Sequence, residues 1–132
     1  MHNENKRMKN EDTNIKDLTK EFALRIIKLY QYLNEEAPRK EYVMSKQILR
    51  SGTSIGANVR EGVRAQSKAD FATKMNIALK EASETEYWLE LLSDAKYLSP
   101  AMADSILEDC RRLNRILTSI VKTTFENIAA KK

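Results

Sequence analysis

The chain has 132 residues, of which 42% are hydrophobic and 32% charged, and it carries a formal net charge of +4. A chain of this length forms one domain that buries about two-thirds of its unfolded surface, so it needs neither disulfides nor a structural metal to fold. Its single cysteine cannot form an internal disulfide and indicates a reducing, cytoplasmic location, while no stretch has the apolar length of a signal peptide core or a membrane span.

The N-terminal residues 1–13 are charged and contain no apolar run, which predicts a disordered polar tail in front of a domain over residues 14–128. The first helix is expected to begin at Asn14 as its N-cap and to end at Asn34 in a left-handed turn. Between them, apolar residues recur at steps of three and four, as one helix face requires. These residues are Ile15, Leu18, Phe22, Ile26, Leu29 and Leu33.

The second helix is expected to open at Pro38, because proline at the first helical position lacks only a donor that would be unpaired anyway. It contains the stretch RSGTSIGANVREG, Arg50 to Gly62, which holds all three glycines of the chain. Gly62 is expected to end the helix in a left-handed conformation.

The stretch GTSIG raises the alternative of a phosphate-binding loop. A P-loop needs four residues between its glycines and a following Lys-Ser/Thr, but here the spacing is one short and Ala57-Asn58 follow. The dinucleotide fingerprint G-x-G-x-x-G is absent as well. The sequence therefore favours a helix in which Gly52 and Gly56 form a strip without side chains, and we expect Tyr87 and Trp88 of the third helix to fill it.

The third and fourth helices are predicted to open at Ser67, with Asp70 completing a capping box, and at Ser99-Pro100. Short connections make consecutive helices antiparallel, and the pattern contains no long period-two alternation. The predicted fold is an all-α, antiparallel, up-down-up-down four-helix bundle. The apolar stripes of these two helices comprise Phe71, Met75, Ala78, Ala82, Thr85, Leu89 and Leu92, and then Met102, Ile106, Cys110, Leu113, Leu117, Ile120 and Ile128.

Catalytic signals are weak. The single histidine is His2, in the polar tail, and there is no Glu-x-x-His pair for a di-iron site. Cys110 lies on an apolar stripe and is interpreted as a buried structural thiol. Glu81 and Glu84 leave open a carboxylate pair, although a salt-bridged surface is the simpler interpretation. We expect no enzymatic activity, no cofactor and no metal.

Charge alternates in blocks along the chain. Residues 39–80 hold nine basic and three acidic side chains, residues 81–110 hold one and eight, and residues 111–132 hold six and one. This alternation is consistent with contacts between subunits, with a basic face for polyanions, or with ordinary solvated helix surface. The predicted nucleic-acid-binding residues are Arg50, Arg60, Arg64, Lys68, Lys74, Arg111, Arg112 and Arg115.

Three runs carry a family resemblance: FALRIIKLYQYL in the first helix, SKQILRSGTSIGANVREG in the second, and AQSKADFATKMNIALKEASETEYWLELL in the third. Over about residues 15–125 the chain resembles the four-helix-bundle proteins encoded in intervening sequences of bacterial 23S ribosomal RNA genes. The resemblance implies a homopentameric ring without known enzymatic activity. At fold level the chain is also similar to the accessory variability proteins of diversity-generating retroelements, which bind nucleic acid and a reverse transcriptase.

Two main functions remain open from the sequence. The first is a ring that binds RNA or DNA phosphates through its basic faces, with a reverse transcriptase or other protein as a partner by analogy and no membrane partner. The second is a structural or protein-docking ring without a nucleic-acid ligand. An enzyme that uses Glu81 or Glu84 is a third, and it requires a carboxylate in a pocket far from any cation.

Overall fold

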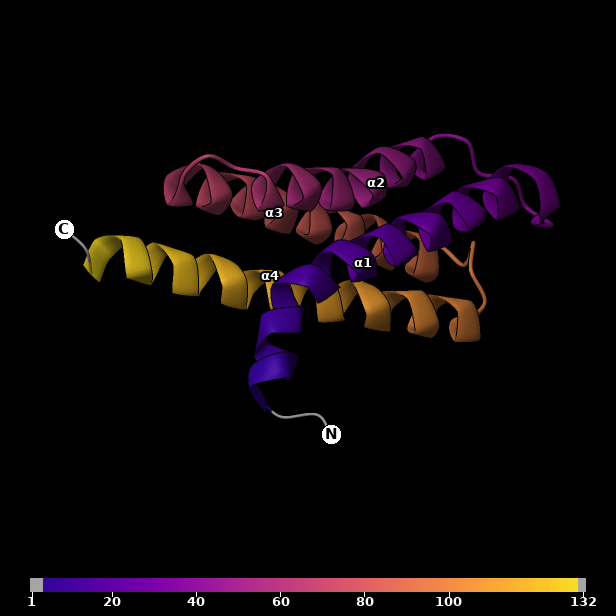
Figure 1. Ribbon diagram of the computed structural model, residues 1–132. Coiled ribbons are helices and arrows are strands. Elements are labelled where there is room, and N and C mark those ends of the chain that lie inside the picture. Colours follow the sequence, from indigo (N-terminus) through magenta and orange to yellow (C-terminus); the bar gives the residue numbers. More distant parts are fainter. Residues whose placement is uncertain (1–3, 131–132) are drawn as a thin grey trace.

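The computed structural model describes the backbone of residues 4–130 and the side chains of residues 14–130. Four long helices account for most of it: α1 (Glu4–Gln31), α2 (Met44–Val63), α3 (Lys68–Asp94) and α4 (Pro100–Ala130). A short π-helical turn, η1 (Tyr32–Glu36), continues α1. The described residues include no strand, and the helices lie lengthwise beside one another (Figure 1). The prediction of an all-α fold with four helices is confirmed.

The start of α1 differs from the prediction. The helix begins at Glu4, so Asn14 lies inside it and is not its N-cap. Figure 1 shows the first turns of α1 bending away from the other helices. The stretch before Asn14 is rich in Lys, Glu and Arg, which are good helix formers but leave no apolar stripe, so hydrophobic periodicity gave no sign of it. The division into a tail of residues 1–13 and a domain of residues 14–128 stays a prediction.

The connection between α1 and α2 is longer than expected, and the prediction that Pro38 opens α2 is wrong. The helix begins at Met44, and no residue at its N-cap supplies a side-chain hydrogen bond. Instead, the buried Glu41 carboxylate accepts the N–H groups of Val43 at 3.2 Å and Ser45 at 2.7 Å. Asn34 is not left-handed, and its amide donates to Ser45 Oγ at 3.0 Å. A carboxylate upstream of α2 thus satisfies its first free donors.

We expect Glu41→Ala to lower the free energy of unfolding by about 1–2 kcal/mol, because two backbone donors at the start of α2 lose a charged acceptor. Urea denaturation monitored by circular dichroism measures the change. Glu36→Ala is the matched control, since Glu36 is exposed in the same region and makes no such contact in the structure. Equal stability of the Glu41→Ala and Glu36→Ala proteins would contradict the capping role.

The ends of α3 and the start of α4 follow common capping rules. Ser67 Oγ accepts the Asp70 N–H at 3.0 Å, and Ser99 Oγ accepts the Met102 N–H at 3.2 Å, which confirms both predicted helix starts. After α3 the chain takes a left-handed conformation at Lys96, with φ of 64°. There the N–H groups of Lys96 and Tyr97 donate to the carbonyls of Ser93 and Leu92, as in a Schellman motif.

The helices bury most of the apolar stripes that the sequence predicts, and only half-bury five of their members: Leu18, Phe71, Met102, Ile120 and Ile128. Side chains of the α1 stripe from Phe22 to Leu33 are nearly inaccessible, as are Met75 to Leu92 in α3 and Ile106 to Leu117 in α4. Helix α1 packs along α2, α2 along α3, and α3 along α4, whereas the contact between α1 and α4 is much less extensive. The core therefore lies among the four helices, and the seam between α1 and α4 is the most open.

The glycines of α2 allow close helix packing, but their neighbour differs from the prediction. A Cβ at Gly52 would lie 2.8 Å from Ile26 Cγ1, and one at Gly56 would lie 3.4 Å from the Thr19 carbonyl oxygen. The expectation that Tyr87 and Trp88 fill this strip is wrong, because α1 supplies the nearest atoms. Helices α1 and α2 approach closely here because the glycines have no side chains.

Gly62 also has a packing role and does not act as a left-handed stop. No described glycine has a positive φ. A Cβ at Gly62 would lie 3.2 Å from Lys74 Cβ and from Met75 Cε. Gly62 is therefore needed for the close approach of α2 to α3.

Candidate nucleic-acid interface

The close contact of α1 with α2 creates a groove with basic rims. Lys16 and Lys20 lie four residues apart on α1 and therefore share one face. Arg60 and Arg64 have the same spacing at the end of α2. The four side chains line a groove of about 520 Å³, whose other lining residues include the small Ala23, Thr53, Gly56 and Ala57. Gly56, which lets the two helices approach closely, is itself one of the small residues that line the groove.

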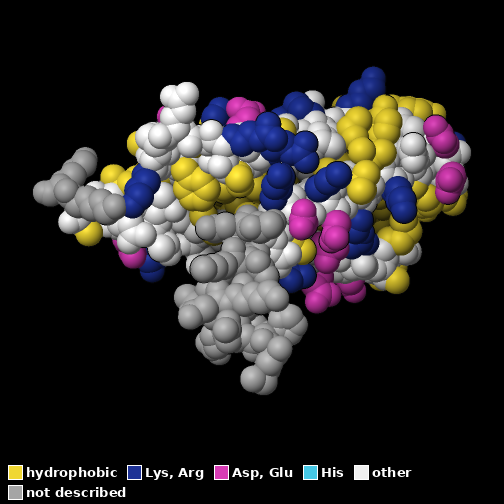
Figure 2. Space-filling view, in the orientation of Figure 1, with side chains coloured by type: hydrophobic (Ala, Val, Ile, Leu, Met, Phe, Trp, Pro, Cys, Tyr) yellow, Lys and Arg dark blue, Asp and Glu magenta, His cyan; other side chains and the backbone are white. Residues whose placement is uncertain are grey.

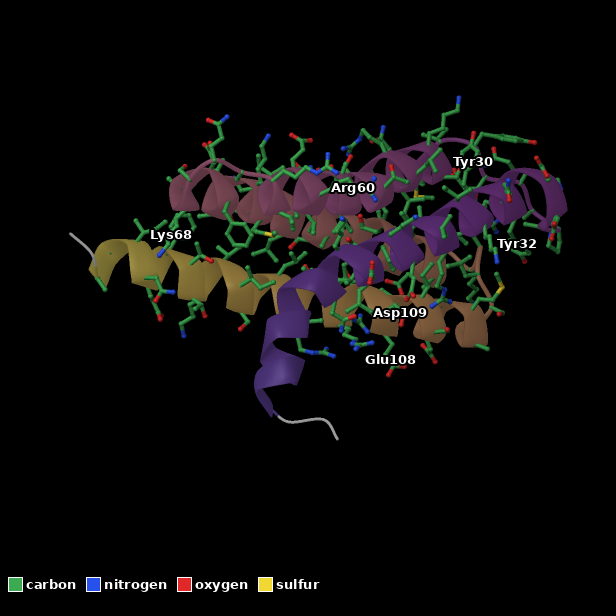
Figure 3. All side chains as sticks on the ribbon, viewed as in Figure 1. Tyr30, Tyr32, Arg60, Lys68, Glu108 and Asp109 are labelled. Carbon is green, nitrogen blue, oxygen red and sulfur yellow. The ribbon has the colours of Figure 1, made fainter. Side chains whose placement is uncertain are left out.

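The groove presents positive charge that the described side chains do not neutralise. None of the side chains of Lys16, Lys20, Arg60 and Arg64 has an ion-pair partner within 4.0 Å in the part of the chain whose side chains are described. Glu61 also lines the groove, but its carboxylate pairs with Lys74 Nζ at 2.9 Å. Figure 2 shows dark blue side chains gathered over the boundary of α1 and α2, and Figure 3 labels Arg60 on this face.

Three of the eight predicted basic residues are instead held in ion pairs with acidic side chains. Arg50 pairs with Glu84 and, at 3.2 Å, with Glu81. Arg111 pairs with Glu86 at 3.2 Å and Glu90 at 3.5 Å. The third, Lys74, bonds to Glu61 as described above. Acidic residues of α3 thus neutralise Arg50 of α2 and Arg111 of α4. Because Arg50, Arg111 and Lys74 are all held in ion pairs, they are weak phosphate ligands.

The remaining predicted residues lie elsewhere. Arg112 and Arg115 line a hollow of about 320 Å³ between α1 and α4, together with Asn14 and Leu18. Lys68 is exposed at the start of α3. Of the predicted set, the structure therefore brings Arg60 and Arg64 together in the groove, where it adds Lys16 and Lys20, and it places Arg112 and Arg115 together at a separate hollow. Sequence reasoning missed these two lysines because residues 1–38 have no net basic surplus, although their i, i+4 spacing was visible.

The carboxylates considered for catalysis are already engaged. Glu81 and Glu84 both pair with Arg50, and Glu84 also accepts the Trp88 Nε1–H at 3.0 Å. Neither is a carboxylate far from a cation, as the enzyme hypothesis required. Among the described side chains, no three His, Cys, Asp or Glu residues gather as metal ligands do. None of the described helices combines the length and apolarity needed to cross a bilayer.

Cys110 is buried, as predicted, and lies 3.5 Å from the Ala82 carbonyl oxygen. Burial, reinforced by the charge of Glu86, raises the pKa of its thiol to about 12. The folded protein therefore keeps the thiol protonated at neutral pH, and a thiolate nucleophile is not available.

The raised pKa predicts a loss of stability in alkaline solution. Between an unfolded pKa of about 9 and the folded value of about 12, the unfolded chain releases the Cys110 proton while the folded chain retains it. The free energy of unfolding should therefore fall in this window by about 1.4 kcal/mol per pH unit from this group. Chemical denaturation of wild type and Cys110→Ala, compared from neutral pH upward, isolates it. Identical pH dependence in the two proteins would show that Cys110 ionises equally well when folded.

Two comparisons with known proteins, one with family models and one with solved structures, found matches. The family model for the 23S rRNA-intervening sequence protein matches residues 11–119. A solved structure of a protein of unknown function from the S23 ribosomal protein family of Bacteroides thetaiotaomicron VPI-5482 is 57% identical, with a TM-score of 0.81. That match covers 85% of this chain and 98% of the other. No curated protein matches the chain.

Proposed function

The chain belongs to the 23S rRNA-intervening sequence protein family, and we propose that it is a non-enzymatic, ring-forming protein that binds nucleic-acid phosphates. Family members of unknown function, such as the Bacteroides thetaiotaomicron protein, do not indicate a ligand by themselves. The proposal therefore depends on the site, and specifically on the groove between α1 and α2.

The observation that carries the proposal is a set of four cations at the groove rims that have no acidic partner among the described side chains: Lys16, Lys20, Arg60 and Arg64. Lys and Arg release the counterions condensed on a nucleic acid when they contact its phosphates. Small residues such as Gly56 and Ala57 leave room for a sugar–phosphate backbone to lie against the helices. No aromatic residue lines the groove, so the contacts are to phosphates and not to stacked bases.

The ring is the second part of the proposal. We infer that the four helices form an up-down-up-down bundle and that five copies close into a homopentamer, as the family resemblance implies. The exposed Leu24, Tyr42 and Val43, with 52%, 54% and 73% of their surface accessible, supply apolar area suited to a contact between copies. Repeating one basic groove around a ring raises the avidity for a long polyanion.

Salt dependence tests the proposal directly. We expect the purified protein to bind both a structured RNA and a DNA duplex, with little sequence preference. If the four rim cations each contact a phosphate, log K will fall against log salt with a slope of about −3 to −4 for one groove, and more steeply for several. Fluorescence anisotropy with labelled RNA and DNA measures the slope. Absence of binding at low salt, or affinity that is insensitive to salt, would overturn the proposal.

The alternative is a structural or protein-docking ring, and the same exposed apolar residues favour it. Arg112→Glu with Arg115→Glu tests whether the hollow between α1 and α4 closes the ring. Arg111 is left unchanged because its ion pairs hold α3 to α4. In a docking ring these reversals reduce the sedimentation coefficient, whereas in a nucleic-acid binder that uses the α1/α2 groove the assembly keeps its size. A reverse transcriptase or other protein partner stays a prediction by analogy.

A further inference from the structure

Another hollow lies between α1 and α4, near the end of α1 and the start of α4. The hollow lined by Arg112 and Arg115 lies at the opposite end of the same seam. The hollow near the end of α1 has a volume of about 580 Å³, and nine residues line it. Figure 3 labels Tyr32 at the end of the bundle where α1 finishes, and Asp109 farther along α4. The hollow exists because α1 and α4 pack against each other much less extensively than the other neighbouring helices.

An ion pair holds the seam at one edge of this hollow. Arg25 Nη1 lies 2.5 Å from Asp109 Oδ2, and Arg25 Nη2 donates to Ser105 Oγ at 3.1 Å. The guanidinium therefore bridges α1 and α4 and has its charge matched by Asp109. The remaining basic group in the hollow is Lys28, which is exposed and has no ion-pair or hydrogen-bond partner in the described part of the chain.

The hollow combines an apolar floor with a few polar groups at its rim. Leu29, Leu98 and Ile106 form the floor and keep only 6%, 5% and 4% of their surface accessible. Met102 lines one side with a flexible thioether that adapts to different shapes. Among the side chains that the structure describes, the Lys28 ammonium and the Tyr32 hydroxyl are the polar groups of the hollow without a hydrogen-bond or ion-pair partner. A ligand with an apolar body and one negative end would match both the apolar floor and the polar groups at the rim.

We propose that this hollow binds a small organic anion with an apolar body, such as a medium-chain carboxylate, with its charged end at Lys28. Small-molecule sites have volumes of about 300–1,000 Å³, mostly apolar walls and a few polar groups that fix orientation, and this hollow has each property. Its nine lining residues are fewer than the about 20–30 that each partner of a standard protein interface contributes, so the hollow by itself has the size of a small-molecule site. The proposal goes beyond nucleic-acid binding and does not rest on it.

The test uses the full chain and decanoate as the probe, followed by NMR of the methionine methyl groups. Met102 lines the hollow, whereas Met75 is 1% exposed in the core and Met44 lies at the start of α2. We expect decanoate to shift the Met102 signal in a saturable way and to leave Met75 and Met44 unchanged. Decanol should bind more weakly by about tenfold, because it lacks the charge that Lys28 attracts. Decyltrimethylammonium should bind no better than decanol.

Matched variants separate the charge from the shape of the site. Lys28→Gln should weaken decanoate about tenfold and leave decanol unchanged, Lys28→Arg should retain most of the affinity, and Lys46→Gln is the control on exposed α2 surface. Ala101→Trp should fill the hollow and abolish the Met102 shift, while Ala129→Trp, exposed near the end of α4, should not. The proposal is overturned if Met102 does not shift, if Met44, Met75 and Met102 shift alike, or if Lys28→Gln binds decanoate as tightly as wild type. If a second copy of the chain covers the hollow and Met102 therefore does not shift, the proposal is also overturned.

Discussion

Gly52→Ala is expected to destabilise the protein by about 2 kcal/mol, although alanine is the better helix former by about 1 kcal/mol. The reason is the close approach of α1. A Cβ at Gly52 would lie 2.8 Å and 2.9 Å from the two γ-carbons of Ile26, which is itself fully buried. Those atoms are next to the branch point of the side chain, so a simple rotamer change cannot move them away without disturbing the core. Thermal or urea denaturation measures the loss.

Gly56→Ala is the matched control and is expected to have the opposite sign. Its Cβ would lie 3.4 Å from the Thr19 backbone and hydroxyl oxygens, near ordinary contact distance. The gain in helix propensity then dominates, and stability should rise by up to about 1 kcal/mol. A double-mutant cycle provides the second control. In an Ile26→Ala background, Gly52→Ala should no longer destabilise, with a coupling energy of about 2 kcal/mol. Equal effects of the two alanine substitutions would contradict this account of the glycines.

The double variant Arg60→Glu, Arg64→Glu is expected to weaken nucleic-acid binding by at least about 100-fold at low salt. Each reversal removes one phosphate attraction and adds one repulsion, and a total of about 2.7 kcal/mol gives this factor. Both side chains are exposed and neither is ion-paired to a described side chain, so the fold should be retained. Fluorescence anisotropy measures affinity, and circular dichroism verifies that the helices are intact.

The control for this variant must change net charge equally without touching the groove. Lys80→Glu with Lys122→Glu does so, because both lysines are exposed on α3 and α4 and neither lines the groove. We expect this control to lose only a small part of the affinity, through the long-range field of the protein. If both double variants lose affinity to the same extent, binding depends on net charge alone and the groove is not the site.

Some features of the fold follow from local sequence patterns. The stripe from Phe22 to Leu33 predicted the buried face of α1, since 3.6 residues per turn place such residues on one side. Ser67 and Ser99 predicted the starts of α3 and α4, because a side-chain oxygen there meets a free backbone donor within the same few residues. The spacing of the glycines in GTSIG also argued against a phosphate-binding loop. It predicted that Gly52 and Gly56 lie inside a helix, as they do in α2.

Other features depend on which helices meet. The sequence predicted a strip at Gly52 and Gly56 but not that Ile26 and Thr19 of α1 occupy it. It predicted basic residues but not that Arg50 and Arg111 are neutralised by α3. These outcomes involve residues more than 20 positions apart, so they are set by the packing of whole helices. The start of α2 was mispredicted for a different and local reason, because its cap is a buried carboxylate at Glu41, four residues before Ser45, and not one of the usual cap residues.

The sequence by itself therefore determined the helical class, the buried stripes, the serine-capped helix starts and the burial of Cys110, since each depends on neighbours within one or two turns. Only the tertiary structure decided which charges remain free. It placed Lys16 and Lys20 of α1 beside Arg60 and Arg64 of α2 and directed the acidic residues of α3 toward other partners. Charge pairing acts over a few ångströms in space, and helix packing sets those distances independently of separation along the chain.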